Sequence, residues 1–237
     1  MEEKTISLKR TASLAASLFF FVCIPLSFWG QTYVLGKIFV PQDPITTANN
    51  LLSNEFLFRM SIVSHFVDTI FFVLMMLLFY RLFRPVGKHL SRLMLVPALA
   101  QITIVFILEI LHYTALMILK SEPRPTFDVA QQQEAAYFLL RMYSYGGGIG
   151  IGKLFIGLCF IPFGMLVFRS GFAPRIIGIL LIIGGVGYVA DCFTSILLQR
   201  ADYLMVRSFL KYTTLAYILA LLWFLIKGVR DQKALIN

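Results

Sequence analysis

The sequence predicts an all-α polytopic membrane protein, a six-transmembrane-helix bundle that forms a single integral membrane domain over residues 1–237. Of the 237 residues, 59% are hydrophobic and 14% are charged, whereas about a quarter of a typical soluble domain is charged. The apolar residues come in runs of about 20, the length that an α-helix needs to cross a bilayer. Lipid is therefore expected to be the main solvent of this chain.

Six apolar runs define the predicted membrane helices. The first follows a basic start and fits either a signal peptide or a helix, but its length and the lack of a clear small-x-small cleavage site favour a helix. Pro25, near the end of this run, would kink a membrane helix rather than prevent it. The predicted helices cover residues 12–34, 57–83, 93–119, 146–168, 174–198 and 206–227.

The Lys and Arg residues predict the orientation, because cytoplasmic segments of membrane proteins retain an excess of them. With the N-terminus inside, twelve lie in the inner segments: Lys4, Lys9, Arg10, Arg81, Arg84, Lys88, Arg92, Arg169, Arg175, Lys227, Arg230 and Lys233. Eight lie in the outer segments: Lys37, Arg59, Lys120, Arg124, Arg141, Arg200, Arg207 and Lys211. Both termini are therefore predicted to be cytoplasmic.

The formal charge of +9 would suggest a nucleic-acid partner in a soluble protein. Here the basic residues are scattered between apolar runs instead of forming one stripe, so no nucleic acid is expected. The longest predicted outer connection, residues 120–145, contains the turn-forming Pro123-Arg124-Pro125. Its second half, residues 130–145, has helical composition and fits either a helix lying on the outer surface or a solvated loop.

Six ionisable residues interrupt the apolar runs and form the candidate polar cluster: His65, Asp68, Glu109, His112, Lys153 and Asp191. An Asp or Lys at the centre of a membrane helix is unfavourable by roughly 2.5 to 3.5 kcal/mol, so such residues normally face the bundle interior and pair. With a rise of about 1.5 Å per residue, all six fall about 3 to 10 Å to the outer side of the bilayer centre. The sequence therefore predicts one polar cluster in the outer half of the bundle.

Helical periodicity places these residues on faces that pack against other helices, since residues three, four and seven apart share a side. Two faces are polar, with Ser61, His65 and Asp68 on the second helix and Gln101, Glu109 and His112 on the third. Two faces are rich in glycine, with Gly146, Gly150, Lys153, Gly157 and Gly164 on the fourth helix and Gly184, Gly187, Tyr188, Asp191 and Ser195 on the fifth. Such small residues let membrane helices approach closely.

Lys153 is the only cation predicted within the bundle. A buried ammonium needs a carboxylate within about 4 to 6 Å to keep its charge. Asp191 is the expected partner, because it lies at comparable depth on the next helix, and a short turn joins the two helices. Asp68 and Glu109 are the second and third choices.

Three interpretations of the cluster stay open. The first is small-solute or ion handling, or sensing, through a cluster that faces outward, because two His and three carboxylates can relay protons or bind a cationic solute. The second is an intramembrane metal-dependent enzyme. The third is a structural or partner-binding membrane subunit, in which the ion pairs fix the bundle.

The metal alternative rests on two short spacings, His65-x-x-Asp68 and Glu109-x-x-His112, each of which puts two ligands on one helical face. Against it, Lys153 nearby would compete with a cation, and the second His pair that multispan zinc hydrolases carry is missing. The three cysteines, Cys23, Cys159 and Cys192, lie far apart inside apolar runs and indicate neither a disulfide framework nor a metal motif. No cofactor is expected, no catalytic residue is assigned, and metal binding stays open.

Four stretches stand out in order and spacing: 47–59 (TANNLLSNEFLFR), 83–86 (FRPV), 168–178 (FRSGFAPRIIG) and 184–191 (GGVGYVAD). They resemble a bacterial membrane protein family, domain of unknown function 4386, over most of the chain. The resemblance implies the bacterial cytoplasmic membrane, with the lipid bilayer as partner, but no activity and no functional residues. It directs attention to Asn49, Glu55 and Arg59, either as a polar entry to the second helix or as a helix cap and a surface pair.

Overall fold

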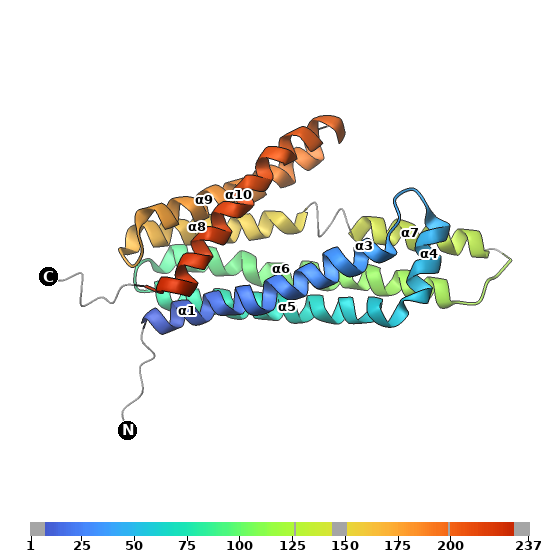
Figure 1. The fold of residues 1–237 in the computed structure, drawn as a ribbon, viewed down its shortest axis with the longest axis horizontal. Coiled ribbons are helices and arrows are strands. Elements are labelled where there is room, and N and C mark those ends of the chain that lie inside the picture. The colour runs from blue at the N-terminus through green and yellow to red at the C-terminus, as the bar shows by residue number, and fades with distance from the viewer. Residues whose placement is uncertain (1–7, 126, 144–150, 199, 230–237) are drawn as a thin grey trace, which may run out of the picture.

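Long helices that run side by side make up most of the protein (Figure 1). The computed structural model describes residues 8–125, 127–143, 151–198 and 200–229. The first helix is continuous over α1 (Leu8–Leu18), η1 (Phe19–Cys23), α2 (Ile24–Ser27), η2 (Phe28–Val34) and α3 (Leu35–Ile38). The remaining helices are α4 (Pro44–Ser53), α5 (Glu55–Phe83), α6 (Lys88–Lys120), α7 (Val129–Tyr143), α8 (Ile151–Ser170), α9 (Arg175–Leu197) and α10 (Arg200–Lys227).

Within the described residues, five helical stretches are long and apolar enough to cross a membrane. They are Arg10–Ile38, Glu55–Phe83, Lys88–Lys120, Gly152–Ser170 and Arg175–Leu197. The predicted sixth span is helical within α10, but its apolar part is the shorter stretch Leu215–Lys227, because charged residues interrupt the first half of this helix. An all-α chain with five candidate spans is therefore established, and the sixth crossing stays a prediction.

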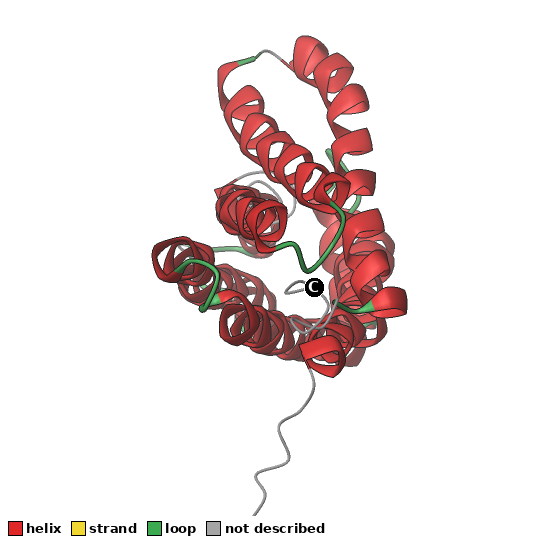
Figure 2. Cartoon of the chain, turned by 90° about the vertical axis from the view of Figure 1, so that its left-hand side faces the viewer, coloured by secondary structure: helices red, strands yellow, loops and turns green. Residues whose placement is uncertain are grey.

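The described ends of the chain lie at one end of the bundle, together with the α5–α6 and α8–α9 connections (Figure 1). The Ser13 hydroxyl donates a hydrogen bond of 3.2 Å to the Leu225 carbonyl and so joins the first helix to α10. Figure 2 views the bundle from this end and shows the helices grouped around its axis. In this arrangement α6 contacts α5, α7 and α8, and α9 packs against α8 and α10.

The α8–α9 pair approaches closely because its facing residues are glycines. A Cβ atom on Gly157 would lie 2.6 Å from the carbonyl oxygen of Gly185, and one on Gly164 would lie 2.5 Å from that of Gly178. Both distances are shorter than van der Waals contact allows, so only glycine permits this backbone separation. The predicted glycine-lined packing is confirmed for Gly157 and Gly164, whereas Gly146 and Gly150, and the predicted start of that helix, lie outside the described residues.

Two segments outside the long helices were predicted incompletely. The helix α4 was not predicted, although Asp43 caps its N-terminus by accepting a hydrogen bond of 2.9 Å from the Thr46 amide and Pro44 occupies its first turn. The helix α7 confirms the helical alternative for the long connection, but it packs lengthwise against α6 instead of lying across the end of the bundle (Figure 1). Its buried face consists of Gln132, Ala136, Leu140 and Tyr143, and the spacing of these residues matches one side of a helix.

Candidate functional site

A polar layer crosses the bundle between two apolar clusters. At the end that holds the chain termini, the larger apolar cluster includes Phe79, Phe83, Phe163 and Phe224, with 4.5 Å between the ring centroids of Phe79 and Phe163. The smaller cluster, towards the other end, includes Val34, Ile38, Phe58, Leu116 and Leu140. The polar side chains of the first helix, α5 and α6 lie between these clusters along each helix, so apolar packing flanks the layer on both sides along these three helices.

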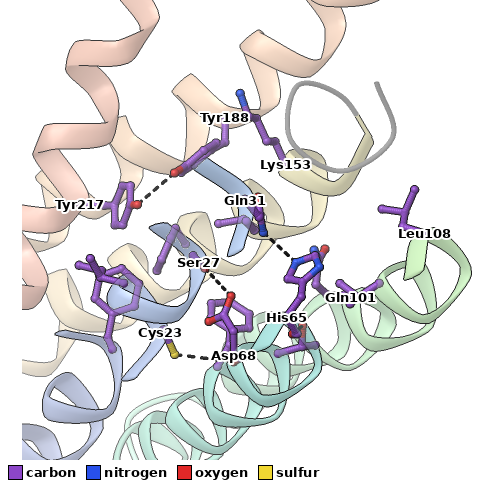
Figure 3. Close-up of a pocket in the computed structure, with 17 residues that line it drawn as sticks. Cys23, Ser27, Gln31, His65, Asp68, Gln101, Leu108, Lys153, Tyr188 and Tyr217 are labelled. Atoms are coloured by element: carbon purple, nitrogen blue, oxygen red, sulfur yellow. Dashed lines mark hydrogen bonds between the residues drawn. The ribbon is translucent and has the colours of Figure 1, made fainter. Parts of the chain in front are cut away.

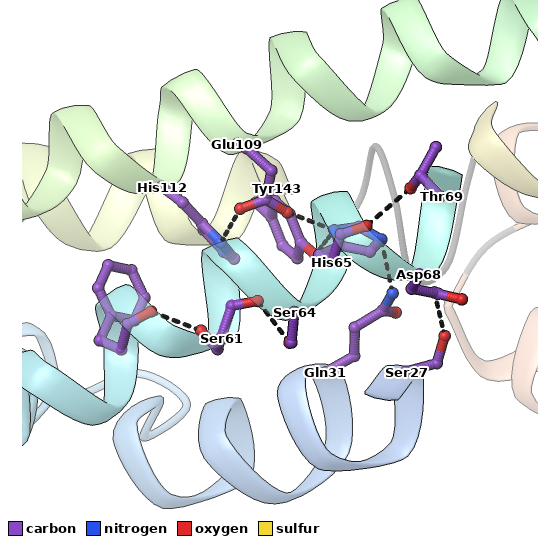
Figure 4. Close-up of polar contacts among 11 residues, drawn as sticks. Ser27, Gln31, Ser61, Ser64, His65, Asp68, Thr69, Glu109, His112 and Tyr143 are labelled. Atoms are coloured by element: carbon purple, nitrogen blue, oxygen red, sulfur yellow. Dashed lines mark hydrogen bonds and ion pairs between the residues drawn. The ribbon is translucent and has the colours of Figure 1, made fainter. Parts of the chain in front are cut away.

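Glu109 is the centre of the most buried part of this layer (Figure 4). Its side chain is 1% exposed. One carboxylate oxygen contacts Nδ1 of His65, and the other lies 3.2 Å from Nδ1 of His112. These contacts are satisfied when both imidazoles carry a hydrogen on Nδ1 and donate it to an ionised Glu109. The network thereby ties α5 to α6 through charge-assisted hydrogen bonds.

Tyr143, at the end of α7, completes this network. Its ring stacks on the His112 imidazole with 3.4 Å between the ring centroids, and its hydroxyl lies 3.1 Å from Nδ1 of His65. The sequence left residues 130–145 open as a surface helix or a solvated loop, and neither alternative places a side chain of this segment inside the bundle. The signal that could have identified Tyr143 is the helical spacing of the apolar face of α7, which ends at this residue.

The first helix contributes two polar side chains that were also missed. The Gln31 amide nitrogen lies 2.8 Å from Nε2 of His65, and the Ser27 hydroxyl donates a hydrogen bond to the Asp68 carboxylate (Figure 4). Gln31 and Ser27 are four residues apart, and Cys23 continues the same spacing towards the chain start. The π-helical turns η1 and η2 hold more residues per turn than an α-helix, which keeps residues at this spacing on one side. The signal in the sequence that could have identified Ser27 and Gln31 is the presence of polar residues within an apolar run.

A pocket of about 280 Å³ opens beside this layer (Figure 3). Its polar lining comes from six helices and includes Ser27, Gln31, His65, Asp68, Gln101, Lys153, Tyr188 and Tyr217. The apolar part of the wall includes Phe19, Ile24, Phe72, Val105, Leu108, Ile156 and Phe160. This volume is close to the lower limit of about 300 Å³ for small-molecule sites, so the pocket has room for a small solute.

Gln101 gives this pocket an acceptor without a partner. Its Oε1 atom is buried and has no hydrogen-bond partner in the described part of the chain. A charged acceptor of the same lining is the Asp68 carboxylate, which accepts a hydrogen bond from the Ser27 hydroxyl. A buried polar atom that lacks a partner is unfavourable, so this side of the pocket favours an occupant that donates hydrogen bonds.

The predicted partnership between Lys153 and Asp191 is confirmed. The Lys153 Nζ atom lies 2.6 Å from Oδ2 of Asp191, and the two side chains are 17% and 9% exposed. The Tyr203 hydroxyl donates a hydrogen bond of 3.1 Å to the other oxygen, Oδ1. Asp191 therefore holds together α8, α9 and α10. In Figure 3 the ammonium end of Lys153 points away from Gln31 and His65.

The six residues of the candidate polar cluster thus divide into three groups. His65, Glu109 and His112 form the buried network; Asp68 pairs with Ser27 at the pocket; and Lys153 pairs with Asp191. His65, Asp68 and Lys153 all line the one pocket, which brings the three groups next to one another. Among the residues that the structure describes, no three His, Cys, Asp or Glu side chains are grouped to hold a metal ion. Of the two short spacings considered for metal binding, His65, Glu109 and His112 meet in the buried network, whereas Asp68 lies apart and pairs with Ser27.

Of the three residues singled out in the first family-like stretch, Glu55 and Arg59 form a surface ion-pair cluster with Lys120. Glu55 accepts from Arg59 at 2.8 Å and from Lys120 at 2.9 Å, and the Arg59 guanidinium lies over the Tyr113 ring. This cluster joins the beginning of α5 to the end of α6. Of the two interpretations, the surface pair is the one that these contacts support.

A family model for a domain of unknown function, DUF4386, matches residues 15–228 of this sequence. The chain belongs to the DUF4386 family. An uncharacterized protein of Archaeoglobus fulgidus is similar to this DUF4386 protein, with 27% identity over 168 residues that cover 71% of this chain and 83% of the relative. No solved structure matches the chain. With its five candidate spans, this DUF4386 chain is a multi-pass membrane protein.

Proposed function

We propose that this protein handles or senses a small cationic, hydrogen-bond-donating solute or ion, which it binds in the pocket beside the polar layer. The observation that carries the proposal is that the Asp68 carboxylate and the unpartnered Gln101 acceptor line the same pocket of about 280 Å³. Charges placed at such depth are unfavourable and usually mark solute or ion pathways.

The charge balance of the pocket supports a cation rather than an anion. Lys153 is the basic side chain of the lining, and its ammonium is engaged by Asp191 at 2.6 Å. Asp68 has no basic partner within the described residues and receives only neutral donors. The carboxylate thus presents a negative charge that a bound cation would neutralise.

The proposal extends to the arrangement in the membrane. The whole chain is one integral membrane domain of the bacterial cytoplasmic membrane, α10 is the sixth crossing, and both termini lie in the cytoplasm. The bundle end opposite the termini then faces outward, and the solute reaches the pocket from that side. The excess of Lys and Arg in the predicted inner segments supports this orientation.

A binding experiment with the purified full-length chain tests the proposal. Thermal unfolding in detergent is measured with sodium, potassium, ammonium, methylammonium and choline chlorides, and with neutral alcohols of similar size as controls. A ligand at a hundred times its Kd stabilises the folded state by about 2.7 kcal/mol, which shifts the unfolding temperature measurably.

Two matched variants locate the effect. Asp68→Asn removes the pocket charge while keeping the size of the side chain, and Glu134→Gln removes a carboxylate that is exposed on α7. We expect stabilisation by at least one cation in the wild type and in Glu134→Gln, and none in Asp68→Asn. The proposal fails if no cation stabilises the wild type, or if the stabilisation survives Asp68→Asn.

A further inference from the structure

A second pocket, of about 160 Å³, lies between α8, α9 and α10. Its lining consists of Lys153, Gly187, Tyr188, Asp191, Arg207, Leu210 and Thr213. Lys153 and Tyr188 also line the larger pocket, so the two pockets share a wall. From the charge of this smaller pocket we infer that it is an anion site, which binds a single phosphate or carboxylate group through Arg207.

The charges of the smaller pocket do not cancel. Its lining carries two basic side chains, Lys153 and Arg207, and one carboxylate, Asp191. Both oxygens of that carboxylate are occupied, Oδ2 by Lys153 at 2.6 Å and Oδ1 by the Tyr203 hydroxyl at 3.1 Å. Both oxygens of Asp191 are therefore already bonded, and no carboxylate of the lining is left to balance the charge of Arg207.

Arg207 has donors available for a ligand. In the part of the chain that the structure describes, its guanidinium makes no ion pair, and it lies 6.0 Å from the centroid of the Tyr203 ring. Stacking on a ring leaves the edge of the guanidinium open, and this edge binds the oxygens of a phosphate or carboxylate in pairs. The volume of the pocket suits a group of a few heavy atoms rather than a larger molecule.

Position along α10 indicates how an anion would reach this site. Arg207 lies two turns before the apolar part of the helix, which starts at Leu215. It therefore lies in the half of α10 that precedes the apolar stretch of this helix. The shared chemistry is one oxyanion group, and its source is either a soluble anion or an anionic lipid.

The experiment uses the delipidated full-length protein in detergent with two probes. Inorganic phosphate is titrated at constant ionic strength and followed by calorimetry, and retention of phosphatidylglycerol is followed by native mass spectrometry. Arg207→Gln removes the charge, and Arg207→Lys keeps it but removes the paired donors. Arg81→Gln is the control, because it removes an exposed charge on another helix, near the C-terminal end of α5.

We expect Arg207→Gln to raise the Kd of the probe that binds by roughly ten- to a hundredfold, because the charge-assisted hydrogen bonds of the guanidinium are lost. The affinity of Arg207→Lys for the probe should lie between those of the wild type and Arg207→Gln, and the affinity of Arg81→Gln should equal that of the wild type. Binding of phosphate assigns a soluble anion, and retention of the lipid without phosphate binding assigns a headgroup. Failure of both probes to bind, or binding equal in the wild type and both Arg207 variants, overturns the inference.

This inference is independent of the proposed cation pocket. Asp68→Asn, which should abolish stabilisation by cations, is expected to leave phosphate or lipid binding unchanged, because Asp68 does not line the smaller pocket. Arg207→Gln is expected to leave stabilisation by cations unchanged for the corresponding reason. Each proposal can therefore fail while the other stands.

Discussion

Lys153 of α8 and Asp191 of α9 form an ion pair with 2.6 Å between Nζ and Oδ2, inside a helix pair whose backbones approach closely through glycines. Lys153 also lies in the wall between the two pockets. The pair therefore stabilises the α8–α9 contact and keeps a charged side chain at the boundary of both candidate sites.

Replacing Lys153 by Met should destabilise the protein by roughly 3 kcal/mol, the lower end of the range for breaking a buried ion pair, because the Lys153 side chain is 17% exposed. The loss arises from the uncompensated Asp191 carboxylate. Replacing both residues, as Lys153→Met with Asp191→Leu, should recover much of this loss, although Tyr203 then loses its acceptor. Unfolding free energies in detergent measure the cycle. Additive losses would contradict a direct coupling between the two residues.

Gly164→Ala should destabilise the α8–α9 contact. The added Cβ would lie 2.5 Å from the Gly178 carbonyl oxygen, and this overlap forces the helices apart at a cost of about 1 to 3 kcal/mol. Gly36→Ala is the control in the first helix, where a Cβ meets no atom within 4 Å. It should be neutral or stabilising, since Ala favours helix over Gly. Equal effects of the two substitutions on thermal unfolding would contradict the packing role of Gly164.

Apolar run length and charge spacing were enough to predict the long helices and the Lys153–Asp191 pair, because both depend on features within one or two neighbouring segments. The grouping of the other site residues was not predictable in this way. Whether His65 turns towards Glu109 or towards Asp68 depends on how α5 is rotated against α6 and the first helix, and the sequence pattern leaves that rotation open.

Three missed features had different causes. The helix α4 had a local signal in Asp43-Pro44, an N-cap followed by proline at the first helical position. Tyr143 enters the network only because α7 packs along α6, a tertiary contact that the composition of a connection does not predict. Ser27 and Gln31 are four residues apart and share a side of the first helix, but the sequence does not show that this side packs against α5.

Acid should weaken the capping of α4. Hydrogen bonding by Thr46 lowers the pKa of Asp43 from its ordinary value, so the ionised cap contributes stability above the unfolded pKa and loses it as the pH falls through the folded pKa. Exchange of the α4 amides, corrected for the intrinsic rate, should therefore be slow at about pH 6 and faster at about pH 2. Asp43→Asn caps the helix without titrating, and its protection should change less. A variant with the same pH dependence as the wild type would argue against this cap.

The end of the bundle opposite the chain termini should face outward. Glu122→Cys places a thiol in the exposed connection after α6, and Lys88→Cys places one at the exposed start of α6. The three native cysteines are buried, so background reaction with a membrane-impermeant maleimide should be low. In intact cells, Glu122→Cys should react and Lys88→Cys should react only after permeabilisation. The reverse pattern would invert the predicted topology.

Glu109 should matter more for stability than Glu55, although both carboxylates join α5 to α6. Glu109 is 1% exposed and accepts from two imidazoles, whereas Glu55 lies at the surface beside Arg59 and Lys120. In Glu109→Gln the amide oxygen can accept from one imidazole, and the other must face the NH₂ group, so both charge-assisted hydrogen bonds of this buried group are lost at a cost of about 1 to 3 kcal/mol. Glu55→Gln makes the same chemical change where water can replace the lost contacts, so its effect should be smaller. Denaturant unfolding in detergent compares the two variants directly. If Glu55→Gln proved as destabilising as Glu109→Gln, the surface cluster and not the buried network would be what fastens α5 to α6.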